Sequence, residues 1–336
     1  MRPLPSSPER KVEPGDFYQF AAFFGSVKQK GASLSPPISA GTETFYFASG
    51  GSVKHPVTGA VMSPRPPDAP SAQLADGVDP RRALTDWLLA PGNPFFARAA
   101  VNRVWAVFFG RGLVEPVDDF RISNPCVNPP LLDALAEDFA LHGYDLKHLM
   151  RTILESRLYQ LSSTPNDTNL ADTRNFARAY RRRLPAEVLL DAVDDATGVP
   201  DNFAATPVGA RATQVWSYKI ESQFMDAFNR PNPSSDPPCE RDKDLSVVQS
   251  LHLMNSKVLQ AKLSHANGRA HKLAGSDQAP TSIVTELYLA TLCRRPTGEE
   301  MQIATAAFTA PDATRQSATE DVFWALLNSA EFVFNH

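Results

Sequence analysis

Hydrophobic residues recur with helical spacing from Pro80 to the end of the chain. The segment RRALTDWLLA (81–90) has apolar residues every three or four positions and stops at Pro91-Gly92. The same spacing predicts helices at 94–109, 131–143, 146–161, 186–198, 245–263, 281–293, 297–309 and 317–330. Capping residues mark several of the ends, with Asn93, Asn128 and Asp145 at starts and Gly110 and Gly198 at stops. The pattern predicts a mostly α, multi-helix globular domain.

The first 77 residues follow a different pattern. Residues 1–15 are polar and proline-bearing, whereas DFYQFAAFF (16–24) is a candidate for a short aromatic helix. TFYFAS (44–49) and SVKH (52–55), separated by Gly50-Gly51, predict a small β-hairpin. We therefore expect residues 1–77 to comprise a disordered start, the remnant of an upstream domain and a linker. The helical domain is expected to span 78–336, with an irregular stretch at 199–220 that includes a short extended piece near 213–216.

Composition narrows the class of protein without identifying a reaction. The 336 residues are 43% hydrophobic and 21% charged, which is typical of a soluble globular protein. The formal net charge of -4 provides no global basic field for nucleic acid, and we expect no nucleic-acid partner. No apolar run reaches the roughly 18 residues that a membrane-spanning helix needs. The N-terminal sequence lacks the apolar core of a signal peptide.

An apolar helix that carries arginine is the most informative segment of the chain. NPFFARAAVNRVWAVFFGRG (93–112) is hydrophobic on most sides, yet it contains Arg98, Asn102 and Arg103. Arg98 and Asn102 are four residues apart and share a face, and Arg103 lies about 100° around the helix from Asn102. Burying an unpaired guanidinium would cost several kcal/mol, so these side chains require partners.

Acidic residues follow this helix within a few positions: Glu115, Asp118 and Asp119. The favoured interpretation is an internal ion-pair network that ties the helix to the following loop. The alternative is an anion-binding pocket that uses Arg98 or Arg103 together with Arg121.

Two further basic segments are candidates for anion binding. Arg181–Arg183 stand directly before the predicted helix at 186–198, where positive charge opposes the helix dipole. The proline-rich loop FNRPNPSSDPPCERDKD (228–244) carries the others. The candidate ligand-binding residues are Arg98, Arg103, Arg121, Arg182, Arg183, Arg230 and Arg241. The structural ion-pair candidates are Asn102, Glu115, Asp118 and Asp119.

Two groups of residues could bind a metal or act in catalysis, but each also has a simpler structural interpretation. His142, Asp145 and His148 could bind a metal, but Asp145 is expected to cap a helix by accepting from the His148 amide. The helix break between the two histidines gives them no fixed common face, so we expect no metal site.

Cys239 could be a nucleophile, with Arg241 lowering its pKa and His252 as base, but His252 lies well inside a predicted helix. The three cysteines, Cys126, Cys239 and Cys293, are far apart and show no zinc-binding spacing. The catalytic residues are therefore unassigned.

The order of several segments resembles one known family. NPFFARAAVNRVWAVFFGRGLVEPVDDFRISNP, RRRLPAEVLLDAVDDATGVP, FMDAFNRPNPSSDPPCERD and ELYLATLCRRPTGEE are similar to motifs of a planctomycete-type C-terminal domain family of unknown function. The resemblance extends from about residue 78 to the end. It implies a long exported protein in which a second uncharacterised domain, and often a planctomycete-type cytochrome c domain, precede this one. The resemblance supplies no catalytic residue.

This sequence departs from that layout because the upstream domain, a haem-attachment motif and a signal peptide are missing. We interpret Met1 as a late start in a truncated or split gene. No cofactor is expected in this chain, and haem c is expected only on the missing domain.

The leading hypothesis is an accessory or interaction module of a larger envelope-associated protein linked to cytochrome c, with the upstream domain or a partner protein as its partner. The alternative is a hydrolase-like enzyme that acts on an anionic polymer such as a sulfated glycan through arginine-rich loops. The sequence leaves the cellular compartment of the chain open.

Overall fold

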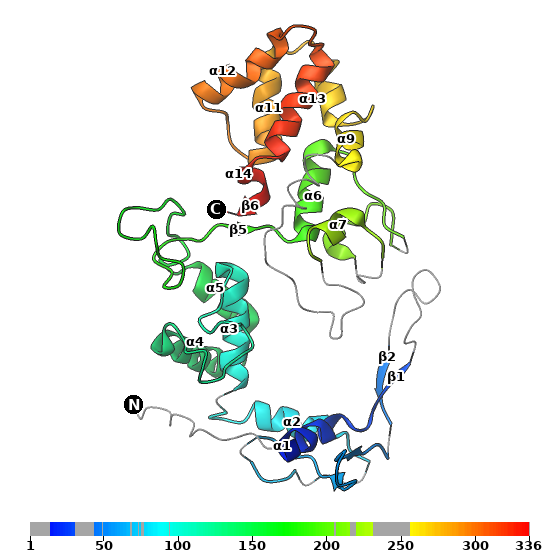
Figure 1. Ribbon diagram of the computed structural model, residues 1–336, viewed down its shortest axis with the longest axis vertical. Helices are drawn as coiled ribbons and strands as arrows, with labels where there is room; N and C mark the ends of the chain where they lie inside the picture. The colour runs from blue at the N-terminus through cyan, green and yellow to red at the C-terminus, as the bar shows by residue number, and fades with distance from the viewer. Residues whose placement is uncertain are drawn as a thin grey trace. The chain divides into compact units, whose positions relative to one another are not determined.

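The computed structural model divides the chain into two compact units, with the boundary between Gln160 and Leu161. The residues described are 14–30, 44–48, 50–67, 69–72, 74, 77–93, 95–204, 206–215, 220–230 and 256–335. Helices dominate both units, and the strands form short antiparallel pairs (Figure 1). The predicted fold class, mostly α with a small hairpin near the N-terminus, is confirmed. In the described part of the chain, no helix has the length and hydrophobicity that crossing a membrane requires.

The first unit contains a short helical segment, two strand pairs and four further helices. In chain order these are α1 (Pro14–Ala21), η1 (Ala22–Phe24), β1 (Val27–Lys30), β2 (Thr44–Phe47), β3 (Val53–Lys54), β4 (Val61–Met62), α2 (Pro80–Leu88), α3 (Phe96–Phe109), α4 (Pro129–Leu141) and α5 (Leu146–Leu154). The last three pack against one another as a group, which Figure 1 shows in cyan to green. Their shared core consists of fully or almost fully buried side chains, among them Val101, Trp105, Leu132, Phe139, Leu149 and Ile153.

Local capping chemistry explains the ends of these helices. Asn128 and Asp145 accept hydrogen bonds from the first turns of α4 and α5, as predicted. Gly110 ends α3 in the left-handed conformation, at φ 79°. Asn93 accepts hydrogen bonds from the amides of Phe95 and Phe96, at 2.9 and 3.3 Å. It therefore caps the turn that leads into α3, although the helix itself begins at Phe96.

The strand pairing differs from the predicted one. We expected 44–49 to pair with 52–55 across Gly50-Gly51, but β2 pairs with β1, and β3 pairs with β4. The reason is a close backbone contact: a Cβ at Gly51 would lie 2.1 Å from the Gly25 carbonyl oxygen. The glycine pair therefore passes against the residues between η1 and β1 instead of forming a tight hairpin turn.

The second unit is built around a continuous hydrophobic core. Its elements are β5 (Arg182–Arg183), α6 (Ala186–Thr197), η2 (Ala212–Gln214), α7 (Gln223–Ala227), α9 (Lys257–Leu263), α10 (Arg269–Ala274), α11 (Pro280–Leu292), α12 (Gly298–Ala306), η3 (Ala307–Thr309), α13 (Arg315–Leu327), α14 (Ala330–Val333) and β6 (Phe334–Asn335). Helices α6, α11 and α13 supply many of the buried residues, including Leu190, Leu287 and Phe323. Strands β5 and β6 pair antiparallel.

Two helix predictions and one predicted extended piece in this unit need correction. The helix predicted over 245–263 is not continuous, because Ser256 has extended backbone angles and caps a helix that begins at Lys257. Residues 245–255 lie outside the described part. Ser329 likewise begins α14, which breaks the helix predicted at 317–330. The extended piece expected near 213–216 is instead a 3₁₀ turn at Ala212–Gln214, and Trp216 lies outside the described residues.

An ion-pair network connects the loop after α11 to α12 and α14. The Arg294 guanidinium donates to both carboxylate oxygens of Glu300 at 2.8 Å and to those of Glu331 at 2.6 and 2.7 Å. Glu300 also accepts from the Thr297 amide at 2.7 Å, completing a capping box. These hydrogen bonds lower the pKa of Glu300 to about 2.

We predict that Glu300→Gln lowers stability at neutral pH and that this difference decreases in acid. The loss at pH 7 should be about 1 kcal/mol, because solvent screens a pair this exposed. The pKa of Glu300 is lower in the folded chain than its ordinary value of 4.5, so the carboxylate contributes stability above that value. The contribution is lost as pH falls from about 4.5 toward 2.

Urea unfolding of both chains at several pH values measures this difference. The control is Glu299→Gln, which removes an exposed carboxylate from the same turn. A difference between Glu300→Gln and the unmodified chain that stays constant from pH 7 to pH 3 would contradict the prediction.

Candidate functional site

The amide of Asn102 is the centre of the first candidate site, in the loop that follows α3. The side chain is fully buried. Its Nδ2 donates to the carbonyl oxygens of Val114 and Val117, at 2.9 and 2.7 Å, and its Oδ1 accepts from the Val114 amide at 3.0 Å. An amide can donate and accept at once, which a carboxylate cannot. Asn102 therefore holds the loop through its backbone and uses all three of these bonds to do so.

The start of the same loop fits closely around Asn102. A Cβ at Gly112 would lie 2.3 Å from the Val114 carbonyl oxygen and 2.8 Å from Asn102 Nδ2, so only glycine fits without a shift. The Glu115 carboxylate folds back and accepts from the Gly112 amide at 2.7 Å. Glu115 thus contacts the backbone of its own loop, and no described arginine is its hydrogen-bond or ion-pair partner.

Arg103 pairs with Asp118, one of its expected partners. Two parallel hydrogen bonds, at 2.7 and 2.6 Å, connect the guanidinium to the carboxylate. The expectation that Arg103 goes inside is wrong, because its side chain is 64% exposed and that of Asp118 is 60% exposed. The pair therefore joins α3 to the loop at the surface.

Arg98 and Arg121 have different partners from one another. Arg98 lies 3.1 Å from the carboxylate of Asp133 on α4, which is not among the acidic residues considered in the sequence. Arg121 donates to Asp119 through Nε at 2.6 Å, and this hydrogen bond lowers the pKa of Asp119. Each of the three candidate arginines of the first unit thus has an aspartate partner.

The second unit contains the remaining described candidates, in β5 and directly after α7. The buried Arg230 guanidinium donates to the Asp226 carboxylate and to the Ile220 carbonyl. Arg183 donates to the Phe228 carbonyl at 3.2 Å and lies over the Phe228 ring. Arg182 pairs with Asn335 in the β5–β6 ladder. Arg241, Cys239, Glu240 and His252 lie outside the described residues.

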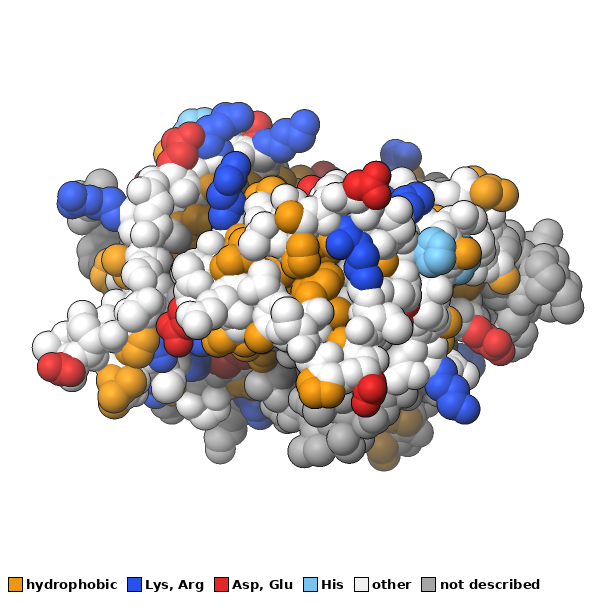
Figure 2. All heavy atoms as spheres, turned by 90° about the horizontal axis from the view of Figure 1, so that it is seen from above, with side chains coloured by type: hydrophobic (Ala, Val, Ile, Leu, Met, Phe, Trp, Pro, Cys, Tyr) orange, Lys and Arg blue, Asp and Glu red, His pale blue; other side chains and the backbone are white. Residues whose placement is uncertain are grey.

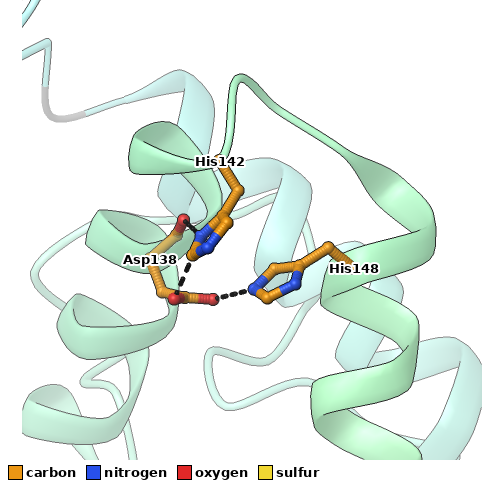
Figure 3. A group of neighbouring side chains, drawn as sticks. All are labelled: Asp138, His142 and His148. Atoms are coloured by element: carbon orange, nitrogen blue, oxygen red, sulfur yellow. Dashed lines mark hydrogen bonds and ion pairs between the residues drawn. The ribbon is translucent and has the colours of Figure 1, made fainter.

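A second candidate site combines Asp138, His142 and His148 (Figure 3). The Asp138 Oδ2 atom lies 2.8 Å from His148 Nε2, and its Oδ1 atom lies 3.2 Å from His142 Nδ1. The two imidazole rings stack with centroids 3.8 Å apart. The expectation that the helix break gives the histidines no fixed common face is therefore wrong. Asp138 was missed in the sequence, although its spacing of four from His142 places both on one face of a helix.

The turn between α4 and α5 explains why these side chains meet. Gly143 and Tyr144 both take positive φ, at 64° and 61°, and the chain reverses there. The Tyr144 ring packs edge-on against Phe96 and Phe139. Asp145 then accepts from the His148 amide at 3.2 Å, as predicted, which places His148 in the first turn of α5. The cluster therefore has fixed anchors in both helices.

The described cysteines have different environments. Cys126 and Cys293 are free thiols, Cys126 being half-buried and Cys293 exposed. Burial raises the pKa of the Cys126 thiol, which keeps it protonated and weakens it as a nucleophile at neutral pH.

We predict that Asn102→Ala destabilises the chain by about 3 kcal/mol, because it leaves buried backbone groups of Val114 and Val117 without partners. Arg103→Ala should cost at most about 1 kcal/mol, since its pair with Asp118 is exposed. Urea denaturation followed by circular dichroism measures both values. Equal losses for the two variants would show that the buried amide does not have this role.

The motifs that contain these sites lie inside the part of the chain that matches a known family. No curated protein and no solved structure is significantly similar to the chain. A family model described as PSD1, a protein of unknown function (DUF1553), matches residues 80–308, which include both candidate sites. The match covers more than half of the chain, and the protein belongs to this family of unknown function.

Proposed function

We propose that the chain is an interaction module of a larger assembly and does not itself carry out a reaction. The observation that carries the proposal is a group of exposed aromatic side chains in α1, η1 and β2. Phe17 is 63% exposed, Phe24 46%, Phe45 60% and Tyr46 46%. Aromatic side chains supply much of the binding energy of protein interfaces, and they are costly to leave in water. We call these four residues of the first unit, which share their exposure and not a single face, the aromatic surface.

The ion pairs of the motif arginines weigh against the enzymatic alternative. A site for a sulfated polymer needs guanidinium groups that are free to meet sulfate oxygens. Arg98, Arg103, Arg121 and Arg230 instead contact aspartates of the same chain. On the described part of the face shown in Figure 2, basic and acidic side chains are interspersed around exposed hydrophobic atoms. Such a surface offers a polyanion little net attraction.

The proposal extends to the context of the module. The sequence resemblance suggests an envelope-associated protein in which another domain precedes this one and a cytochrome c domain is present. In that setting, the aromatic surface would pack against the preceding domain, or against a separate protein that contains it. Haem c would belong to the partner, and this chain would contribute contact surface only.

We predict that this chain binds the domain that precedes it in other family members. The Phe17→Ser/Phe45→Ser variant should bind at least about tenfold more weakly, because each serine removes a large apolar contact from the interface. Calorimetric titration of the separately expressed partner domain measures the affinities, and circular dichroism verifies that each variant is folded.

The matched control is Ile122→Ser, since Ile122 is 71% exposed in the same unit but lies outside the aromatic surface. Binding that is absent in the unmodified chain, or that Ile122→Ser weakens equally, would refute the proposal.

For the enzymatic alternative we predict a negative result. Dextran sulfate should bind the chain weakly, and Arg98→Ala should leave that affinity within about twofold, because the guanidinium already pairs with Asp133. Arg230→Ala should instead lower the unfolding free energy by about 2 kcal/mol or more, because it leaves a buried carbonyl and a carboxylate without their donor. Loss of dextran sulfate binding in folded Arg98→Ala would favour the anionic-polymer enzyme.

A further inference from the structure

We propose that Asp138, His142 and His148 form a binding site for one divalent first-row transition-metal ion such as Zn²⁺. The three side chains offer two imidazole nitrogens and a carboxylate oxygen, and one ligand atom from each lies within 4.8 Å of the others. This site lies apart from the aromatic surface, and it does not depend on the proposed interaction role.

The type of ligand selects the class of metal. Imidazole suits zinc, copper, nickel and iron, whereas calcium and magnesium prefer sets of oxygen ligands. Two histidines with one carboxylate make a familiar ligand set for zinc, and three protein ligands leave a fourth position for water. The site therefore fits a borderline transition metal better than an alkaline-earth ion.

The separations between the ligand atoms are close to those that a metal requires. Zinc bonds to nitrogen and oxygen of about 2.0–2.1 Å place tetrahedral ligand atoms about 3.3 Å apart. In the structure, Asp138 Oδ2 lies 2.8 Å from His148 Nε2 and Asp138 Oδ1 lies 3.2 Å from His142 Nδ1, and one ligand atom from each residue lies within 4.8 Å of the others. Binding would replace these direct contacts with bonds to the ion, and the side chains would need to rearrange locally so that one atom of each lies about 3.3 Å from the others.

The backbone around the cluster would keep the ligand residues in place, whereas the His142 side chain could still change its orientation. The main-chain oxygen of Asp138 accepts from the His142 amide at 3.0 Å and lies 2.9 Å from His142 Nδ1. With Nδ1 as the ligand atom, binding would replace this contact, because a nitrogen whose lone pair binds the ion has no proton to donate. The stacked rings must tilt so that their lone pairs converge on the ion, and His142, with a half-exposed side chain, is free to turn.

The test is calorimetric titration of the full chain, freed of metal by a chelator, with Zn²⁺ at neutral pH. We expect one ion per chain with micromolar affinity. His142→Ala and His148→Ala should each weaken binding at least about tenfold, because loss of even an outer-shell partner can cost 10- to 100-fold. Both substitutions preserve the backbone amides that cap and close the helices.

The matched control is His271→Ala, which removes an exposed histidine from α10 of the second unit and should leave the affinity unchanged. Co²⁺ absorption provides a second measurement, because thiolate ligands give an intense charge-transfer band that imidazole and carboxylate ligands do not give. Absence of saturable Zn²⁺ binding, equal affinity in the His148→Ala variant, or a thiolate band in the Co²⁺ spectrum would each overturn the proposal.

Discussion

The fold of the first unit depends on one constraint, which is that its buried backbone amide and carbonyl groups must find hydrogen-bond partners. The loop after α3 buries Leu113 and Val114, and burial of these side chains takes the adjacent amide and carbonyl groups out of water. No strand among the described residues lies beside the loop to satisfy them, so the Asn102 amide does so from the neighbouring helix. The Leu113 carbonyl then accepts from the Val127 amide at 2.8 Å, which connects the loop to the start of α4. The position of α4, and of the cluster it carries, follows from this path.

This arrangement explains how an apolar helix can carry two arginines. A guanidinium stands at the end of a long aliphatic stem, so the stem can pack along a hydrophobic helix while the charge reaches its edge. Arg98 and Arg103 both do this, and their partners Asp133 and Asp118 lie on the elements that α3 contacts. The residue of this segment that is truly buried is the neutral Asn102, whose desolvation costs less than that of a charge.

Features set by neighbouring residues could be predicted from the sequence, and features set by distant residues could not. Asn128, Asp145, Gly110 and Gly198 end or begin helices as their side chains and backbone preferences dictate. Pairing of β2 with β1 depends on a backbone contact between Gly25 and Gly51, which no local pattern reveals. Arg98 likewise pairs with Asp133, which lies thirty-five positions further along the chain and across a helix contact, and no local pattern marks so distant a carboxylate as its partner.

The histidine cluster lies between these two cases. Its residues are close in sequence, but helical spacing alone does not set their relative orientation across the helix break. The orientation follows from two constraints acting together. Tyr144 is held between Phe96 and Phe139, and Asp145 caps α5 through the His148 amide. With the turn fixed at both ends, the first turn of α5 can place His148 only beside the last turn of α4, where Asp138 and His142 share a face. A capped turn between two packed helices can therefore preorganise a ligand set, and the caps themselves need not be ligands.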